Sequence, residues 1–213
     1  GQTDIPNDLV NPVAVSTSQY HTCAIDDNGV QCWGRNQYGQ TDVPALSNPV
    51  QVSAGINHTC AIDDNGLQCW GDNQLGQSDV PTLSNPVQVA PGGGHTCALD
   101  FFGVQCWGVI SEGSVNVPMP ALSNPVQIIS GSNHSCAIDD NGLQCWGINN
   151  TGETVVPALS NPAQVSIGDS HICAVDDNGV QCWGNNGWGQ TDVPSLSNPV
   201  QVSAGTDHTC AID

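Results

Sequence analysis

One string of residues returns at nearly constant spacing along the whole chain. HTCAIDDNGVQCWG begins at His21, and close copies begin at His58, His95, His134, His171 and His208. The steps between these histidines are 37, 37, 39, 37 and 37 residues. A second string, GQTDVPALSNPVQVSAG, begins at Gly39 and recurs between the copies. A period of about 40 residues that is marked by tryptophan and glycine is typical of propeller blades.

Each repeat contains short strand-like runs and no helical pattern. NPVQVSAG alternates apolar and polar residues, and HTCAID and GVQCWG form two further runs around Asp-Asn-Gly. Pro44 and Pro49 exclude a helix from the segment between the runs. We therefore predict an all-β fold, a β-propeller with roughly three to four antiparallel strands per blade, the short fourth strand lying near GQTDVP.

The repeats also suggest how the chain is organised. They begin near residues 13, 50, 87, 126, 163 and 200, and the last one is incomplete. We expect residues 1–213 to form a single β-propeller domain, with about six or seven blades when complete. Both ends of the sequence fall inside a repeat, and we expect them to have been cut from a longer array.

One register of the hairpin in each repeat meets two requirements at once. If its Asp-Asn pair forms a two-residue type I′ turn, Cys23 faces Cys32, and Ile25 faces Val30. Because side chains alternate across a strand, these four residues share one apolar face. A slip by one residue would place the two cysteines on opposite faces. The register that pairs the cysteines therefore also builds the apolar face.

The eleven cysteines indicate disulfides and an oxidising compartment. There is no C-x-x-C pair of the kind that zinc sites use, and the cysteines of each repeat are nine residues apart. We predict the disulfides Cys23–Cys32, Cys60–Cys69, Cys97–Cys106, Cys136–Cys145 and Cys173–Cys182. The alternative is that these cysteines pack as buried thiols. Cys210 is left over, and its partner would lie nine residues on, beyond Asp213. We expect an extracellular or cell-surface protein.

The charge of the chain excludes several kinds of partner. Arg35 is the only basic side chain among 20 acidic ones, and the formal net charge is −19. Such a chain repels nucleic acid and anionic membrane surfaces, so we exclude both as direct partners. No apolar run is long enough to span a membrane, so direct membrane insertion is not expected. Cations, basic proteins and neutral sugars remain compatible with the charge.

The repeats resemble those of the regulator of chromosome condensation, in the disulfide-bearing form found in bacterial exported proteins. The matching pieces are the H-T-C-A-I run, the Asp27-Asn28-Gly29 turn, and C-W-G-R-N leading to Gly39-Gln40. The G-Q-T-D-V-P linker is also similar to that of a secreted β-lactamase inhibitor of the same propeller type. The resemblance implies a propeller, commonly of about seven blades. It also implies a function in nucleotide exchange, enzyme inhibition or a surface role, and exchange on an intracellular GTPase fits an exported chain poorly.

Three kinds of polar or aromatic residue recur in the repeats. The histidines could form a metal-binding ring, but we favour the interpretation that each ties its strand to the preceding turn. The five tryptophans of C-W-G are interpreted as blade-packing residues, although exposed ones could bind sugars. The Asp-Asp-Asn-Gly turns are interpreted as turn chemistry. We therefore expect no cofactor and no dedicated metal site, with weak calcium binding between turns as the alternative.

Residues that depart from the repeat are the candidate binding residues. Phe101 and Phe102 replace Asp-Asn at the third hairpin tip, and they form either a contact site or a turn packed under the longer loop of residues 109–120. The loop after C-W-G also varies, holding Arg35 and Tyr38, then Asp72 and Leu75, then Asn185, Asn186 and Trp188. Variable aromatic residues on a fixed scaffold are typical of a binding surface, and the alternative is drift in a solvent loop.

No set of residues points to catalysis, because histidine and aspartate follow the repeat and there is no phosphate loop. We therefore expect a non-enzymatic extracellular scaffold for binding or assembly, part of a larger adhesion-type protein. The partner would be a protein, a glycan or copies of the chain itself. The alternatives are a structural fibre subunit, a secreted enzyme inhibitor acting through Tyr38, Leu75 and Trp188, and a carbohydrate-binding propeller.

Overall fold

The computed structural model of the chain describes residues 1–110 and 119–213, and its regular elements in these ranges are all β-strands. The chain divides into two compact units, Gly1–Val109 and Ile110–Asp213. The strands of the first unit are β1 (Ala14–Thr17), β2 (His21–Asp26), β3 (Gly29–Gly34), β4 (Gln51–Ala54), β5 (His58–Asp63), β6 (Gly66–Gly71), β7 (Gln88–Pro91), β8 (His95–Asp100) and β9 (Gly103–Gly108). The strands of the second unit are β10 (Gln127–Ser130), β11 (His134–Asp139), β12 (Gly142–Gly147), β13 (Gln164–Ile167), β14 (His171–Asp176), β15 (Gly179–Gly184), β16 (Gln201–Ala204) and β17 (Thr209–Ile212).

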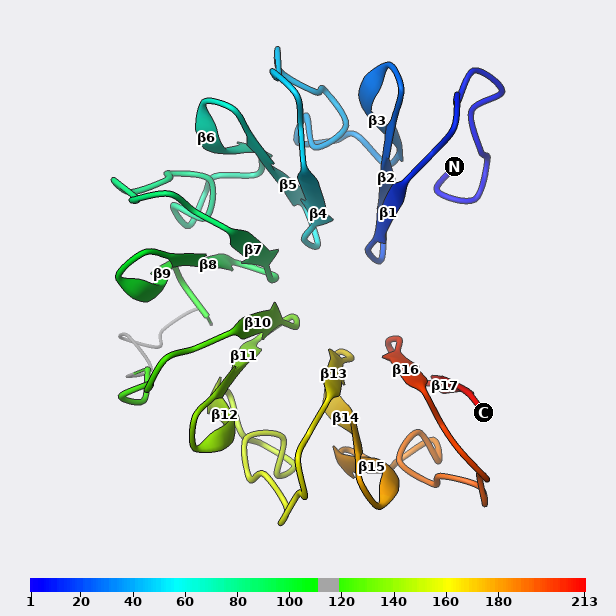
Figure 1. Cartoon of the computed structure of the whole chain (residues 1–213). Helices are drawn as coiled ribbons and strands as arrows, with labels where there is room; N and C mark the ends of the chain where they lie inside the picture. The colour runs from blue at the N-terminus through cyan, green and yellow to red at the C-terminus, as the bar shows by residue number, and fades with distance from the viewer. Residues whose placement is uncertain (111–118) are drawn as a thin grey trace. The chain divides into compact units, whose positions relative to one another are not determined.

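Each full repeat forms its own three-stranded antiparallel sheet in sequence order, as Figure 1 shows. The register of β2 and β3 pairs Cys23 with Cys32, Ile25 with Val30, and Asp26 with Gly29. The predicted two-residue length of the hairpin turn is confirmed, and the same register recurs in β5–β6, β8–β9, β11–β12 and β14–β15. The predicted type I′ conformation is wrong, because neither Asp27 nor Asn28 has a positive φ and Gly29 takes a φ of 110° instead. In the last repeat, β17 pairs with β16.

The five predicted disulfides are confirmed, and each joins two directly facing cysteines of one hairpin. The first cysteine of each pair is fully buried. Cys210 is exposed and is not part of a disulfide. No helix in the described part of the chain is long and apolar enough to cross a membrane.

The apolar face of each hairpin packs against the first strand of the next repeat in the same unit. Cys23 and Ile25 contact Val52 of β4, and Val30 and Cys32 pack around them. The same arrangement places Val89 of β7 against the second hairpin, and Val202 of β16 against the fifth. The core is thus a series of small clusters, each shared by two consecutive repeats, so a repeat buries its apolar face only beside its neighbour.

Where the structure describes the linkers between repeats, they add no strand. The possible short fourth strand near GQTDVP is absent, and Gly39–Asp42 forms a turn whose Asp42 N–H donates to the Gly39 carbonyl at 3.0 Å. Asn48 then takes a φ of 50° in the Ser-Asn-Pro corner, a conformation that asparagine tolerates better than most residues. The side chain of Asn48 donates to Asp64 at the hairpin tip and fixes this corner.

Candidate functional site

The repeated histidines join neighbouring repeats. His21 Nε2 lies 2.8 Å from the Thr59 hydroxyl of the next repeat, and His58 Nε2 lies 2.8 Å from the Thr96 hydroxyl. The Thr59 hydroxyl donates to the Gln40 carbonyl, so His21 must donate from Nε2. The expected bond from a histidine to its own turn is seen at His21, whose Nδ1 lies 3.0 Å from the Ser18 hydroxyl. The tie between repeats was not predicted.

The repeated tryptophans are also used inside the fold. Trp70 Nε1 donates to the Gln40 carbonyl at 3.0 Å, and Trp107 Nε1 donates to the Gln77 carbonyl. One linker carbonyl thus accepts a hydroxyl and an indole from the next repeat. Trp146 is buried. The other four tryptophans, Trp33, Trp70, Trp107 and Trp183, are half-buried, and sugar binding by them stays a prediction.

The hairpin-tip aspartates are held by amide donors. Asp26 accepts the backbone N–H groups of Val10 and Asn28, each at 2.8 Å, and the side chain of Gln31 at 3.0 Å. The hydrogen bond from Val10 is the largest cause that lowers the pKa of Asp26, and burial opposes it. Among the described residues, no group of three His, Cys, Asp or Glu side chains could hold a metal ion. Weak calcium binding stays a prediction.

In the loop after C-W-G, the same hydrogen bonds hold the backbone in a fixed frame in several repeats, whereas the side chains around it differ. Asn36 donates to Asp42 at 2.7 Å and accepts the Thr41 N–H at 3.0 Å. Gln40 is fully buried, and its side-chain oxygen accepts the Tyr38 N–H at 3.0 Å. The second and fifth repeats build the same frame around Asn73 and Asn186, with Leu75 and Trp188 at the position of Tyr38. The frame repeats because it fixes the backbone, whereas the side chains that it presents differ.

Each of these loops meets the turn that precedes the histidine of its own repeat. The Arg35 N–H donates to the Tyr20 carbonyl at 2.8 Å, and the Asp72 N–H donates to the Asn57 carbonyl at 2.9 Å. Gly34 permits this approach, because a Cβ there would lie 2.6 Å from the Tyr20 carbonyl oxygen and its φ is 113°. The turn residues also vary between repeats. We define the loop–turn face of the first unit as residues 19–20, 35–38, 56–57 and 72–75.

Aromatic and cationic side chains gather on the loop–turn face. The Arg35 guanidinium lies over the Tyr20 ring, 4.7 Å from its centroid. Tyr38 is 39% exposed, while Leu75 is half-buried against Gly94, the turn of the next repeat. Tyr20 was missed in the sequence because only the loops after C-W-G were compared. A comparison of the two residues before each repeated histidine, which differ in every repeat, would have found it.

The predicted residues Phe101 and Phe102 lie at a different end of their sheet. They form the β8–β9 hairpin tip, while Gly94 and Val109 meet at the opposite end of the same two strands. Their rings pack edge to face with centroids 5.3 Å apart, and they are 76% and 79% exposed. The alternative that they pack under the loop of residues 109–120 concerns a segment that lies largely outside the described residues.

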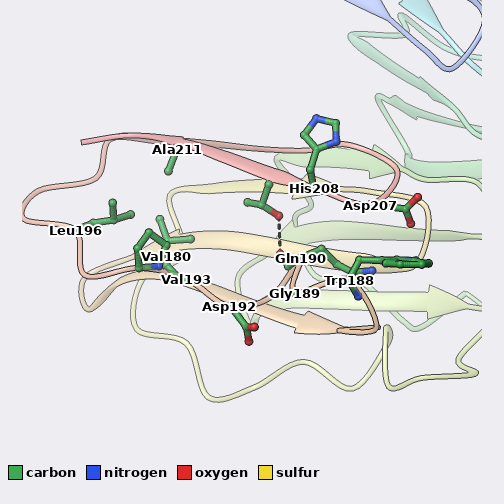
Figure 2. A pocket seen from close by; sticks show the side chains of 12 residues that line it. Val180, Trp188, Gly189, Gln190, Asp192, Val193, Leu196, Asp207, His208 and Ala211 are labelled. Carbon is green, nitrogen blue, oxygen red and sulfur yellow. Dashed lines mark hydrogen bonds between the residues drawn. The ribbon is translucent and has the colours of Figure 1, made fainter.

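In the second unit, Trp188 is 79% exposed and lines a cavity of about 310 Å³ (Figure 2). The cavity is also lined by Val180, Gln190, Asp207, His208 and Ala211. Thr209 and Ala211 of β17 also line it. The Gln190 carbonyl accepts the Thr209 hydroxyl at 2.8 Å, as the Gln40 carbonyl accepts the Thr59 hydroxyl.

The junction of the fourth and fifth repeats breaks the histidine rule. Ile172 stands where other repeats have a hydroxyl residue, and His134 Nε2 is buried without a hydrogen-bond partner. Burial lowers the pKa of His134, and the carboxylates of Glu153 and Asp169 oppose this shift. Glu153 itself replaces the buried linker glutamine and accepts both the N–H and the hydroxyl of Thr151 at 2.8 Å. None of these departures was singled out in the sequence.

A family model described as "Regulator of chromosome condensation (RCC1) repeat" matches residues 13–40, 50–77, 126–153 and 163–190, more than half of the chain. No curated protein matches the sequence significantly.

Three solved structures show the same fold at low sequence identity. Yeast RCC1 (Prp20), solved with Kap60 bound, has a TM-score of 0.80 and 20% identity, covering 97% of this chain and 69% of that one. The CRINKLY WD40 ectodomain of the Arabidopsis thaliana receptor kinase ACR4 has a TM-score of 0.76 and 22% identity, covering 97% and 78%. The entire ectodomain of the Physcomitrella patens receptor kinase CR4 has a TM-score of 0.76 and 24% identity, covering 94% and 61%.

The chain thus spans less than two thirds of the moss ectodomain. These likenesses confirm the predicted fold class, an all-β propeller fold of three-stranded repeats.

Proposed function

Because the chain belongs to the regulator of chromosome condensation (RCC1) repeat family, we propose that it is a non-catalytic, extracellular scaffold that binds a protein partner at the loop–turn face. The five disulfides support an oxidising compartment. Two structural neighbours are receptor ectodomains, and a third was solved with a protein bound.

The observation that carries the proposal is the concentration of rare side chains on this face. The chain has two tyrosines and one arginine, and all three lie within the loop–turn pair of the first repeat. Tyrosine and arginine are the residue types most enriched where protein interfaces hold most of their binding energy. Their positions are free to vary, since the loop frame of Asn36 and Gln40 is built without them.

The net charge of the chain narrows the class of partner. A charge of −19 favours encounter with a protein of net positive charge and slows association with acidic ones. We therefore propose a partner that is basic overall. Its association rate should fall as salt is added, because surface charges more than about 8 Å apart are screened at physiological ionic strength.

Site-specific photo-crosslinking tests the proposal. A photoreactive phenylalanine analogue replaces Gln74, an exposed loop residue of this face, or Val50, which is 74% exposed and lies on another part of the first unit. We expect the Gln74 probe, but not the Val50 probe, to crosslink a discrete extracellular protein, and Tyr38→Ala to abolish the product. Equal products from both positions would contradict the proposed face. Products that join two copies of the chain would favour self-association instead.

A further inference from the structure

Among the residues that the structure describes, Arg35 forms no ion pair, although the chain is rich in acidic residues. The sequence holds 20 of them, yet the only ion pair within residues 1–110 and 119–213 joins the Gly1 amine to Asp4. The Arg35 guanidinium instead stacks on the Tyr20 ring and donates from one nitrogen to the Gln37 side chain. A buried or half-buried cation is normally paired with a carboxylate, so the charge of Arg35 is incompletely satisfied within the chain.

Contacts with Tyr20 and Gln37 hold the guanidinium in place. Its central carbon lies over the Tyr20 ring, 4.7 Å from the centroid, and the Arg35 N–H bond to the Tyr20 carbonyl fixes the backbone beside it. A guanidinium has five N–H donors in its plane, and Gln37 takes one of them. The remaining in-plane donors have the geometry that binds a carboxylate through two parallel hydrogen bonds.

The fold itself does not require an arginine at this position. The equivalent residues of the other repeats are Asp72, Val109, Ile148 and Asn185, and each makes the same backbone hydrogen bond to the turn before its histidine. The loop frame therefore forms equally well with aspartate, valine, isoleucine or asparagine at this position, and the guanidinium is not needed for it. Its stack on Tyr20 is likewise specific to the first repeat, since the other turns have no tyrosine.

We propose that Arg35 is the receptor for one carboxylate group of the protein partner, which it binds through two hydrogen bonds beside Tyr20 and Tyr38. This inference rests on the proposed function and names the chemistry that the loop–turn face recognises. The net charge of −19 repels ligands that carry several negative charges, such as sulfated glycans and phosphate. A single carboxylate on a partner that is otherwise basic meets less repulsion, so the face selects an acidic side chain or a chain terminus.

A titration of the free protein tests the receptor without the partner. Arg35 is the only arginine, so its Nε–H gives one signal of that type in a nitrogen-15 correlation spectrum. Sodium acetate is added against sodium chloride at constant ionic strength, with sodium sulfate as the polyanion and N-acetylarginine amide as the reference compound. We expect acetate to shift the Arg35 signal with saturation, at a dissociation constant at least about tenfold below the reference value.

One variant separates the receptor from a merely exposed charge. Tyr20→Leu removes the stacking ring while keeping the backbone carbonyl, and its Arg35 signal should respond like the reference compound. A wild-type response equal to that of the reference, or a stronger response to sulfate than to acetate, would overturn the inference. Thermal unfolding of this variant verifies that it folds.

Partner binding gives the second readout. Arg35→Gln should weaken binding about tenfold to hundredfold, because a hydrogen bond to a charged group is lost. Arg35→Lys should restore only part of the affinity, because an ammonium group lacks the planar pair of donors. Crosslinking at Gln74 without an acetate response would leave the proposed function standing and refute the carboxylate receptor. An acetate response without any crosslinked protein would support the carboxylate receptor and refute the proposed function.

Discussion

Acidification from about pH 7 to pH 5 should destabilise the first unit, because its buried histidines fold in the neutral form. Burial lowers the pKa of His21 to about 4 and that of His58 to about 3, from the ordinary value of 6.5. Since the folded-state pKa lies below the unfolded one, the unfolded chain binds more protons as the pH falls through 6.5. Stability is therefore full above about pH 7 and is lost progressively toward the folded-state pKa.

The structure gives both a magnitude and an atomic cause for this loss. For His58 alone, a shift from 6.5 to about 3 corresponds to a loss of about 2 kcal/mol between pH 7 and pH 5, and His21 acts in the same direction. Protonation would place an N–H at His58 Nδ1, which is buried without a hydrogen-bond partner. The shifted carboxyl groups, such as Asp26 and Asp63, titrate below this range because their pKa values lie under 3.8.

Urea unfolding at a series of pH values, followed by near-ultraviolet circular dichroism without reductant, measures the loss. His58→Gln retains an N–H donor near Thr96 but cannot titrate, so it should remove about 2 kcal/mol of the pH-dependent part. His208→Gln, at the equivalent but exposed position of the last repeat, is the matched control. An unfolding midpoint that stays constant from pH 7 to pH 5, or an equal pH slope in wild type and His58→Gln, would refute the reasoning.

Three further predictions follow from the contacts between repeats and at the hairpin tips. Thr59→Val should reduce the free energy of unfolding by about 1–3 kcal/mol, because it leaves the His21 N–H buried without an acceptor. Thr22→Val, which loses one bond to the Gln2 carbonyl, should cost only about 0.5–1.5 kcal/mol, and equal losses in urea unfolding would contradict the histidine tie. His134→Leu should cost about 1 kcal/mol less than His58→Leu in the same measurement, because His134 Nε2 has no partner to lose, and a larger cost would disprove this. The double substitution Phe101→Asp and Phe102→Asn should raise the free energy of unfolding by about 0.5–1 kcal/mol, because Asn85 could then donate to the new aspartate as Asn48 donates to Asp64. Crosslinking at Gln74 should stay unchanged, and lost crosslinking would mean that the hairpin tip takes part in recognition.

The strands and the disulfides could be predicted because two independent constraints select the same register. The period of two in the side chains places Cys23 and Ile25 on one face, and the turn length places Cys32 opposite Cys23. Both constraints are local, since they act within one hairpin. The sequence therefore contained enough information to define each sheet without any knowledge of its neighbours.

The contacts between repeats could not be predicted in the same way. A threonine follows the histidine in most repeats, but the pairing of His21 with Thr59 of the next repeat depends on how two sheets pack. The separation of the candidate residues has a similar origin. Leu75 and Phe101 were both predicted as binding residues, yet Leu75 reaches the turn at Gly94, and Phe101 lies at the far end of β8 from that turn.

The fourth repeat shows how the scaffold keeps its architecture while changing what it presents. The Gln40 side chain accepts the Tyr38 N–H but leaves its own Nε2 buried without a partner. Glu153 accepts the Thr151 N–H in the same way, and its second oxygen accepts the Thr151 hydroxyl.

In this repeat, glutamate replaces the frame glutamine and threonine replaces the large side chain. The two changes together give the buried polar atoms of the frame hydrogen-bond partners, and these bonds offset the burial of the carboxylate. As a result, the Thr151 hydroxyl is engaged by Glu153 of its own loop, whereas the Tyr38 and Trp188 side chains remain exposed. Recognition should therefore depend on the repeats that keep glutamine, and grafting the Thr-Gly-Glu sequence of residues 151–153 onto residues 38–40 should abolish binding without unfolding the first unit.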